Sequence, residues 1–164
     1  MDGVPRDTER RKDGDALPKG MERRLVLRLL SYWRGLCDGD RLPSFAAVQP
    51  IAMADMWPSC FVLDVAGHEA NPVFRRAGEA FAAHVPDLLN RRVSEVPANT
   101  LVHASVSYVG EVVAKAVPIS RGGEFYKGDG TKVLYRSIVL PMSDDGETVS
   151  GLLCAANCRE VREG

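Results

Sequence analysis

The sequence has 164 residues, of which 45% are hydrophobic and 7% aromatic, a composition that supports one compact domain with one ordinary core. Its 21 basic and 22 acidic residues give a formal net charge of -1, so no long-range field attracts nucleic acid or an anionic membrane. No apolar run approaches the roughly 20 residues of a membrane-spanning helix, and residues 1–20 lack the apolar segment of a secretion signal. We therefore expect a cytoplasmic protein that binds neither nucleic acid nor a membrane.

The first 20 residues and the segment after them differ in composition. Residues 1–20 are charged and rich in Gly and Pro, with too few apolar side chains to offset the entropy of ordering, which predicts a disordered tail. From Met21 onward, apolar residues recur at the spacing of one helix face, which predicts an amphipathic helix over about 21–36 in an N-terminal unit of 21–40. The residues of this face are Leu25, Val26, Leu29, Leu30, Trp33 and Leu36.

Two strands and a short helix are predicted after this unit. Apolar residues alternate with Asp64 over residues 60–65, and the run 72–76 follows the turn-forming sequence AGHEANP, which predicts a pair of antiparallel strands. A short helix is expected over 78–85, and the segment from there to Pro97 is expected to be mostly loop.

The strongest helix signal begins at Thr100, a suitable N-cap, and ends before Pro118. A stripe of valines falls within about one 60° sector of this helix. It consists of Val102, Val106, Val109 and Val113. Strands are then predicted over 119–126, 131–140 and 149–157, joined by the turn sequences KGDG and SDDGE.

This order of elements predicts an α+β fold with a five-stranded antiparallel sheet and helices inserted between strands 2 and 3. In the strand predicted over 131–140 both alternating sets of side chains are apolar, as in strands that are covered on both faces. One set is Val133, Tyr135 and Val139, and the other is Leu134, Ile138 and Leu140. The inserted helices are expected to cover one face and the N-terminal helix the other, alone or with the same helix of a second subunit.

Several stretches are distinctive when taken together: SYW, WPSCFVLDV, FRRAGEAF, GGEF, GLLCAANCRE and, the most specific of them, LYRSIVLPMSDDG. With the order of elements, they resemble the PAS domain family, and in particular short bacterial proteins built from a single PAS domain. The resemblance covers about residues 25–160. It implies a PAS-like domain over 41–160 that senses, signals or binds protein and has no catalytic motif.

Two short motifs are similar to motifs of proteins with other functions. GGEF, residues 122–125, is similar to the signature hairpin of bacterial diguanylate cyclases, but that signature has five letters and requires an upstream metal-binding aspartate, so we judge the match coincidental. Residues 157–159, NCR, are similar to the NCRFLQ motif of flavin-binding light sensors. Here FLQ is missing, and the letters end a predicted strand instead of lying on a helix.

Few residues are candidates for chemistry. The four cysteines, at 37, 60, 154 and 158, form no C-x-x-C pair and are expected to be reduced apolar residues. His103 on the long helix is similar in position to the haem ligand of some PAS domains, but its place at the edge of the valine stripe favours an ordinary boundary residue. No hydrolase, metalloprotease, P-loop or dinucleotide motif occurs. We therefore predict no catalytic residue and favour a domain without metal or cofactor.

The space between the valine stripe and the sheet is a candidate ligand pocket. It would hold a small apolar or aromatic ligand, oriented by Ser105, Tyr135 or Arg136. Arg136 would need a partner, either Glu124 or an anionic ligand. The alternative, which we favour, is that the side chains interdigitate and fill the core. The candidate lining residues are Phe74, Phe81, Val102, Ser105, Val106, Val109, Val113, Tyr135 and Arg136.

The sequence therefore predicts a non-catalytic PAS-type sensory, signalling or protein-interaction module that acts through a protein partner. Its mechanism would be a shift in the packing of the N-terminal helix against the sheet. We expect a homodimer through this helix, with Leu29, Leu30 and Trp33 as contacts. A small-ligand or haem sensor is the alternative, and a small α+β enzyme or a diguanylate cyclase fragment is less favoured.

Overall fold

The computed structural model describes residues 24–67, 71–83, 85 and 87–161, so the tail predicted for residues 1–20 lies outside the described residues. None of the helices in these ranges has both the length and the apolar surface needed to cross a membrane. The α-helices are α2 (Arg24–Leu36), α3 (Pro50–Met53), α4 (Glu79–Ala82), α5 (Leu101–Ser105) and α6 (Val109–Lys115). The short 3-10 helices are η1 (Phe45–Ala47), η2 (Trp57–Ser59) and η3 (Val93–Glu95). The strands are β1 (Cys60–Asp64), β2 (Val73–Ala77), β3 (Ile119–Tyr126), β4 (Lys132–Met142) and β5 (Gly151–Val161).

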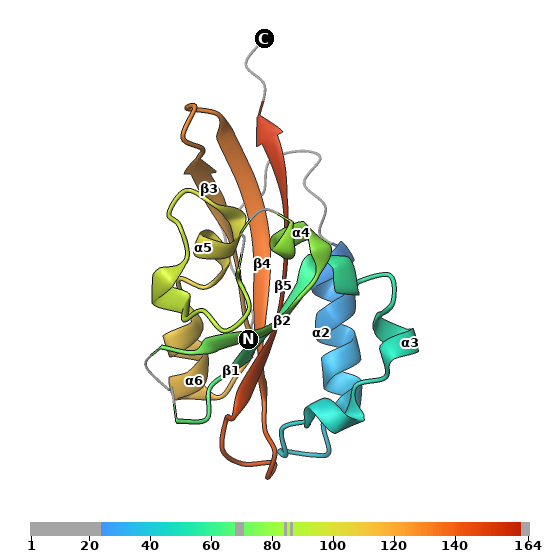
Figure 1. The fold of residues 1–164 in the computed structure, drawn as a ribbon. Coiled ribbons are helices and arrows are strands. Elements are labelled where there is room, and N and C mark those ends of the chain that lie inside the picture. Colours follow the sequence, from blue (N-terminus) through green and yellow to red (C-terminus); the bar gives the residue numbers. More distant parts are fainter. Residues whose placement is uncertain (1–23, 68–70, 84, 86, 162–164) are drawn as a thin grey trace.

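The strands form one antiparallel sheet in the order β2-β1-β5-β4-β3 (Figure 1). β4 and β5 pair along their whole length, from Lys132 opposite Val161 to Met142 opposite Gly151. In the chain, α4, α5 and α6 all come between β2 and β3. The predicted α+β fold, with a five-stranded antiparallel sheet and helices inserted between strands 2 and 3, is confirmed.

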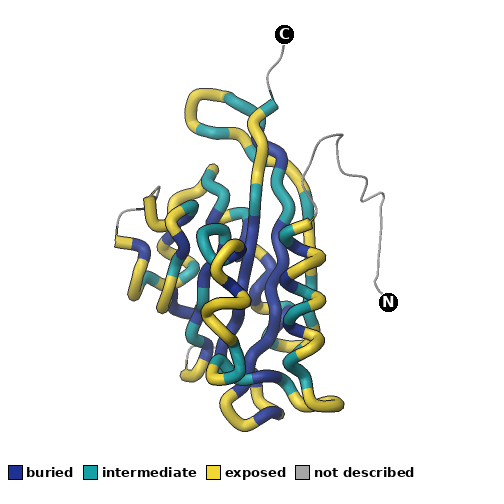
Figure 2. The backbone as a smooth tube through the Cα atoms, turned by 90° about the vertical axis from the view of Figure 1, so that its right-hand side faces the viewer, coloured by how far each residue is buried: buried dark blue, intermediate teal, exposed yellow. Residues whose placement is uncertain are grey.

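Helices cover both faces of the sheet, and a separate hydrophobic core lies on each face (Figure 1). The inner core, beneath α4, α5 and α6, contains Val139 and Cys154, and the outer core, beneath α2, contains Ile138 and Leu153. Because side chains alternate along a strand, neighbouring residues of β4 and β5 enter opposite cores. The middle of the sheet is accordingly buried while the outer surfaces of the helices are exposed (Figure 2).

Helix α2 packs on the outer face of β4 and β5 through Val26, Leu29 and Trp33. The indole Nε1 of Trp33 donates a hydrogen bond to the Pro141 carbonyl at 2.9 Å, which satisfies the one polar atom of this buried ring. Leu29 and Trp33, which we expected to contact a second subunit, are therefore occupied by the sheet of their own chain. Leu30, the third expected contact, is half-buried at the edge of the outer core.

The single helix predicted over residues 100–117 is broken into α5 and α6. The hydroxyls of Ser105 and Ser107 donate to backbone carbonyls four and three residues earlier, a local interaction that competes with a regular helix. An unbroken helix would place Val106 and Tyr108 on opposite sides. The break turns both toward the inner core, where both are buried.

The last two strands are longer than predicted. β4 continues to Met142, and β5 continues through the polar run Asn157 to Glu160 up to Val161. This run has no apolar alternation, so the sequence pattern gave no sign of a strand there. Pairing with β4 over the whole of this segment holds it in the sheet.

Leu29→Ala is expected to lower the free energy of unfolding by about 2–5 kcal/mol, because it leaves a cavity under α2. Leu27→Ala on the same helix removes a side chain that is 57% exposed and should change this free energy by less than about 0.5 kcal/mol. Urea denaturation followed by circular dichroism measures both. Equal losses in the two variants would contradict the observed orientation of α2.

Candidate functional site

Side chains fill the middle of the space predicted as a ligand pocket. The Phe61 ring packs against the rings of Phe74 and Phe81, with centroid distances of 5.6 and 4.8 Å, and all three are buried. The stripe valines in the same inner core are Val102, Val106 and Val109, with the half-buried Val113 packed at its edge. A ligand cannot occupy this part of the domain without displacing packed side chains.

A cavity of about 470 Å³ remains at one end of the inner core, where α4 and α5 face the ends of β3, β4 and β5. Of the residues predicted to line a pocket, Phe81 and Val102 line this inner cavity. Its rim carries the ion pair between Lys127 Nζ and Glu160 Oε2, at 2.9 Å, so the rim presents little net charge. The other lining residues are Ser59, Ala80, Val85, Asn99, Thr100, Leu101, Phe125, Val133, Ala156, Asn157 and Cys158.

The polar side chains predicted to orient a ligand lie outside the described lining of the inner cavity. The Ser105 hydroxyl donates to the Leu101 carbonyl at 2.7 Å. Tyr135 is half-buried, with its ring centroid 6.1 Å from that of Phe125. Arg136 is two residues before Ile138 on β4 and therefore shares its outer-core face, across the sheet from the inner cavity. The β3 residue opposite Arg136 is Gly122, whereas Glu124 of β3 lies opposite Leu134.

His103 is exposed on α5, and its imidazole does not enter the inner core. Its backbone N–H donates to the Thr100 hydroxyl at 3.2 Å, which confirms Thr100 as the N-cap of the helix. The exposed position of His103 fits the boundary residue that the sequence analysis favoured over a haem ligand. Within the described ranges, no group of three or more His, Cys, Asp and Glu side chains could hold a metal ion.

Tyr108 is a buried polar residue that the sequence analysis missed. Its hydroxyl lies 2.6 Å from the Ser137 hydroxyl, and the Arg121 guanidinium lies 5.0 Å from its ring centroid. Arg121 also forms an ion pair with Glu111 at 2.6 Å. Burial strongly raises the pKa of the Tyr108 hydroxyl, so this group stays neutral. The network connects α6 to both β3 and β4.

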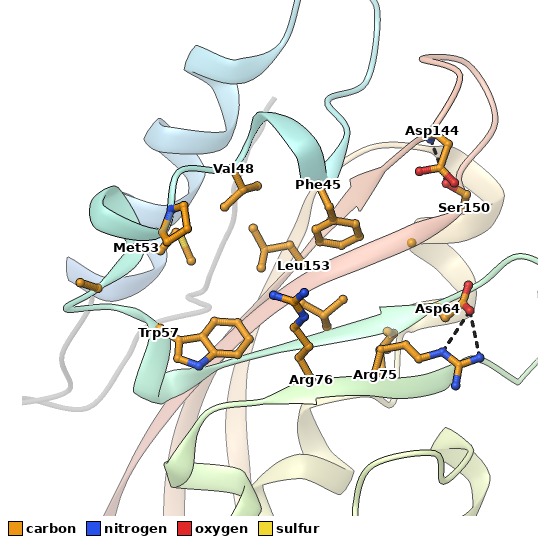
Figure 3. A pocket seen from close by; sticks show the side chains of 15 residues that line it. Phe45, Val48, Met53, Trp57, Asp64, Arg75, Arg76, Asp144, Ser150 and Leu153 are labelled. Carbon is orange, nitrogen blue, oxygen red and sulfur yellow. Dashed lines mark hydrogen bonds and ion pairs between the residues drawn. The ribbon is translucent and has the colours of Figure 1, made fainter.

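A second cavity, of about 570 Å³, lies on the outer face of the sheet (Figure 3). Val62 of β1 and Leu153 of β5, which lie opposite each other in the sheet, form its floor. The segment 45–54 forms one wall, and β2 forms the other. We call this cavity the outer groove. Its lining residues are Phe45, Val48, Pro50, Met53, Ala54, Trp57, Val62, Leu63, Asp64, Arg75, Arg76, Asp144, Ser150, Gly151 and Leu153.

The two arginines of the outer groove differ in their contacts. Arg75 forms an ion pair with Asp64 at 3.1 Å and donates to the Asn90 side chain at 3.0 Å. Arg76 extends into the groove toward Leu153 (Figure 3), and within the described residues it forms no hydrogen bond or ion pair. Arg76 therefore presents to the groove a guanidinium that no residue in the described ranges neutralises.

Two glycines permit close contacts around the cavities. A Cβ at Gly151 would lie 2.7 Å from the Phe45 ring, so glycine allows this ring to rest over β5 in the outer groove. A Cβ at Gly78, the N-cap of α4, would overlap the Trp57 carbonyl oxygen. The Gly78 N–H donates to the Cys60 carbonyl at 2.7 Å, which holds the start of α4 against η2 and β1.

The strand order and the inserted helices define a small α+β domain with a five-stranded antiparallel sheet. A family model described as PAS domain matches residues 21–155. The chain belongs to the PAS domain family, which confirms the resemblance seen in its sequence.

The remaining comparisons gave structural neighbours alone, since no curated protein matches the chain. The chain is similar to the LOV domain from the blue-light activated histidine kinase of Erythrobacter litoralis, at 11% identity and a TM-score of 0.45, over 63% of this chain and 96% of that one. It is also similar to the light-state LOV structure of the blue-light photoreceptor Aureochrome1, at 16% identity and a TM-score of 0.45, over 68% and 88% of the two chains.

The two short motifs GGEF and NCR both lie in strands. Residues 122–125, GGEF, lie inside β3 and pair with Val133 to Arg136 of β4, so they do not form a hairpin turn. Residues 157–159, NCR, lie near the end of β5, as predicted.

Tyr108→Phe is expected to lower the free energy of unfolding by about 1 kcal/mol, because it removes a buried hydrogen bond to Ser137. Tyr126→Phe is the matched control, since the Tyr126 hydroxyl donates to Glu124 on an exposed part of β3, and it should change the free energy by less than about 0.5 kcal/mol. Urea denaturation measures both. A Tyr108→Phe variant as stable as the wild type would show that the buried bond adds no net stability.

Proposed function

We propose that the chain is a non-catalytic PAS-type sensory and protein-interaction module, which acts in the cytoplasm through a protein partner. The observation that carries this proposal is the position of α2, which closes the outer core with one side and presents its other side to solvent. A partner that binds one packing of α2 more tightly than another would shift the population toward it. The nearly balanced charge supports a protein partner better than nucleic acid or a membrane.

The partner surface we propose is the exposed side of α2 together with α3. It carries two large apolar side chains, Leu27, which is 57% exposed, and Ile51, which is 91% exposed. We propose that these two side chains are buried together against another protein surface. We propose a homodimer through this surface, in which Leu27 and Ile51 take the role first predicted for Leu29 and Trp33.

The double variant Leu27→Gln/Ile51→Gln is expected to raise the dissociation constant of the homodimer at least about tenfold, because each apolar side chain contributes about 1.5 kcal/mol or more when buried. The matched control is Leu89→Gln/Val117→Gln, which changes side chains that are 50% and 45% exposed outside α2 and α3. Sedimentation velocity over a range of concentrations measures the association.

Two results would contradict this homodimer. One is a wild-type protein that sediments as a monomer at every concentration. The other is a control variant that weakens association as much as Leu27→Gln/Ile51→Gln does.

A small-ligand sensor is the second candidate function, and the inner cavity favours it. Its volume of about 470 Å³ lies within the range of small-molecule sites. Its apolar walls and its neutralised Lys127–Glu160 rim suit an uncharged, mostly apolar ligand.

Native mass spectrometry and an absorbance spectrum of the purified protein test this second function. The wild type is expected to carry an additional bound mass. Ala80→Phe, which adds bulk inside the inner cavity, should lose it, while Ala82→Phe on the exposed side of the same helix should keep it. A wild type with no bound mass and no absorbance beyond that of its aromatic residues would count against a tightly bound ligand.

A further inference from the structure

The outer groove combines an apolar floor with a guanidinium that no described residue neutralises. Val62 and Leu153, opposite each other on β1 and β5, form the floor. Met53 and Trp57 also line the groove. Arg76 extends over this apolar surface (Figure 3). A guanidinium presents its N–H groups in a planar fork that matches a carboxylate, and such paired, charge-assisted hydrogen bonds are stronger beside apolar surface than in open water.

The neighbouring charges make the Arg76 side of the groove the positive one. Asp64 is neutralised by Arg75 at 3.1 Å, so this pair adds little net charge. Asp144 lies away from Arg76, beside Ser150, whose hydroxyl accepts a hydrogen bond from the Asp144 backbone N–H at 3.0 Å (Figure 3). An anion in the groove is therefore attracted to Arg76 and repelled from the Asp144 side.

The shape of the groove suits a compact molecule better than a continuous peptide. Trp57 stands toward one end and Phe45 toward the other, where Gly151 allows the Phe45 ring to rest on β5. The volume of about 570 Å³ lies within the range of small-molecule sites. A chain running through the groove would have to pass over these half-buried rings.

We propose that the outer groove binds a small amphipathic carboxylic acid. The carboxylate accepts hydrogen bonds from Arg76, and the apolar body lies on Val62 and Leu153, toward Phe45. The site is distinct from the inner cavity, because the two lie on opposite faces of the sheet. It also goes beyond the proposed interaction function, because binding of the acid requires no protein partner.

Decanoate is the probe and decan-1-ol is its uncharged control, both used below the concentrations at which they aggregate. The full chain labelled with nitrogen-15 is titrated with each, and the indole N–H signals of Trp57 and Trp33 are followed by NMR. Trp57 lines the groove, whereas Trp33 is buried under α2 and serves as an internal reference. Decanoate should move the Trp57 signal saturably and leave the Trp33 signal nearly in place, and decan-1-ol should bind at least about tenfold more weakly.

Arg76→Gln is expected to raise the dissociation constant of decanoate at least about tenfold and to leave that of decan-1-ol unchanged, because it removes only the charged partner. Arg34→Gln is the matched control, since Arg34 is an exposed arginine on α2 outside the groove, and it should change neither constant. An unchanged Trp33 signal in each variant shows that the fold is intact.

Equal affinity for the acid and the alcohol, or equal decanoate affinity in the wild type and Arg76→Gln, would overturn this assignment. A decanoate titration that moves the backbone N–H signals of Val102 and Val133 in the inner cavity and not the Trp57 signal would overturn it as well. The same titration in Leu27→Gln/Ile51→Gln separates ligand binding from self-association, because the groove should bind decanoate whether or not the homodimer forms.

Discussion

The pairing of β4 with β5 is the constraint on which the rest of the structure depends. Both strands are apolar on both faces at the middle of the sheet, with Ile138 and Leu153 toward one side and Val139 and Cys154 toward the other. A sheet of this kind has to be covered twice to keep its side chains out of water. The inserted helices cover one face, and α2 covers the other, so α2 is part of the fold of its own chain before it can serve any partner.

A regular helix and an irregular segment together cover the outer face of the sheet. α2 packs on β4 and β5 as a regular amphipathic helix, whereas the outer groove lies over β1 beside short helical turns and loops. The helix α2 and the irregular segment 45–57 leave a space between them above Val62 and Leu153. In the resulting gap, apolar surface meets Arg76, which no described residue neutralises, and this gives the domain a candidate binding region on the face opposite the inner cavity.

Periodic patterns predicted most of the fold but little of the candidate sites. The two-sided burial of β4 was visible because its alternating residues are apolar in both sets, and β3 matches its predicted range, Ile119–Tyr126, because turn sequences and Pro118 delimit it. The break between α5 and α6 was not predicted, because valine periodicity does not reveal the contact of Tyr108 with Ser137, 29 residues away, that accompanies the break. The outer groove was missed because residues 45–57 have no period and meet β2 and β5 only in the folded chain.

Gly78 contacts a segment whose residues line cavities on both faces of the sheet. η2 contributes Trp57 to the outer groove and Ser59 to the inner cavity, and the first residues of α4 rest directly on its backbone. Gly78 has no side chain to hold the two segments apart, so any larger residue there would displace η2, α4 or both. A substitution at this one position would therefore affect both the outer groove, through Trp57, and the inner cavity, through Ser59.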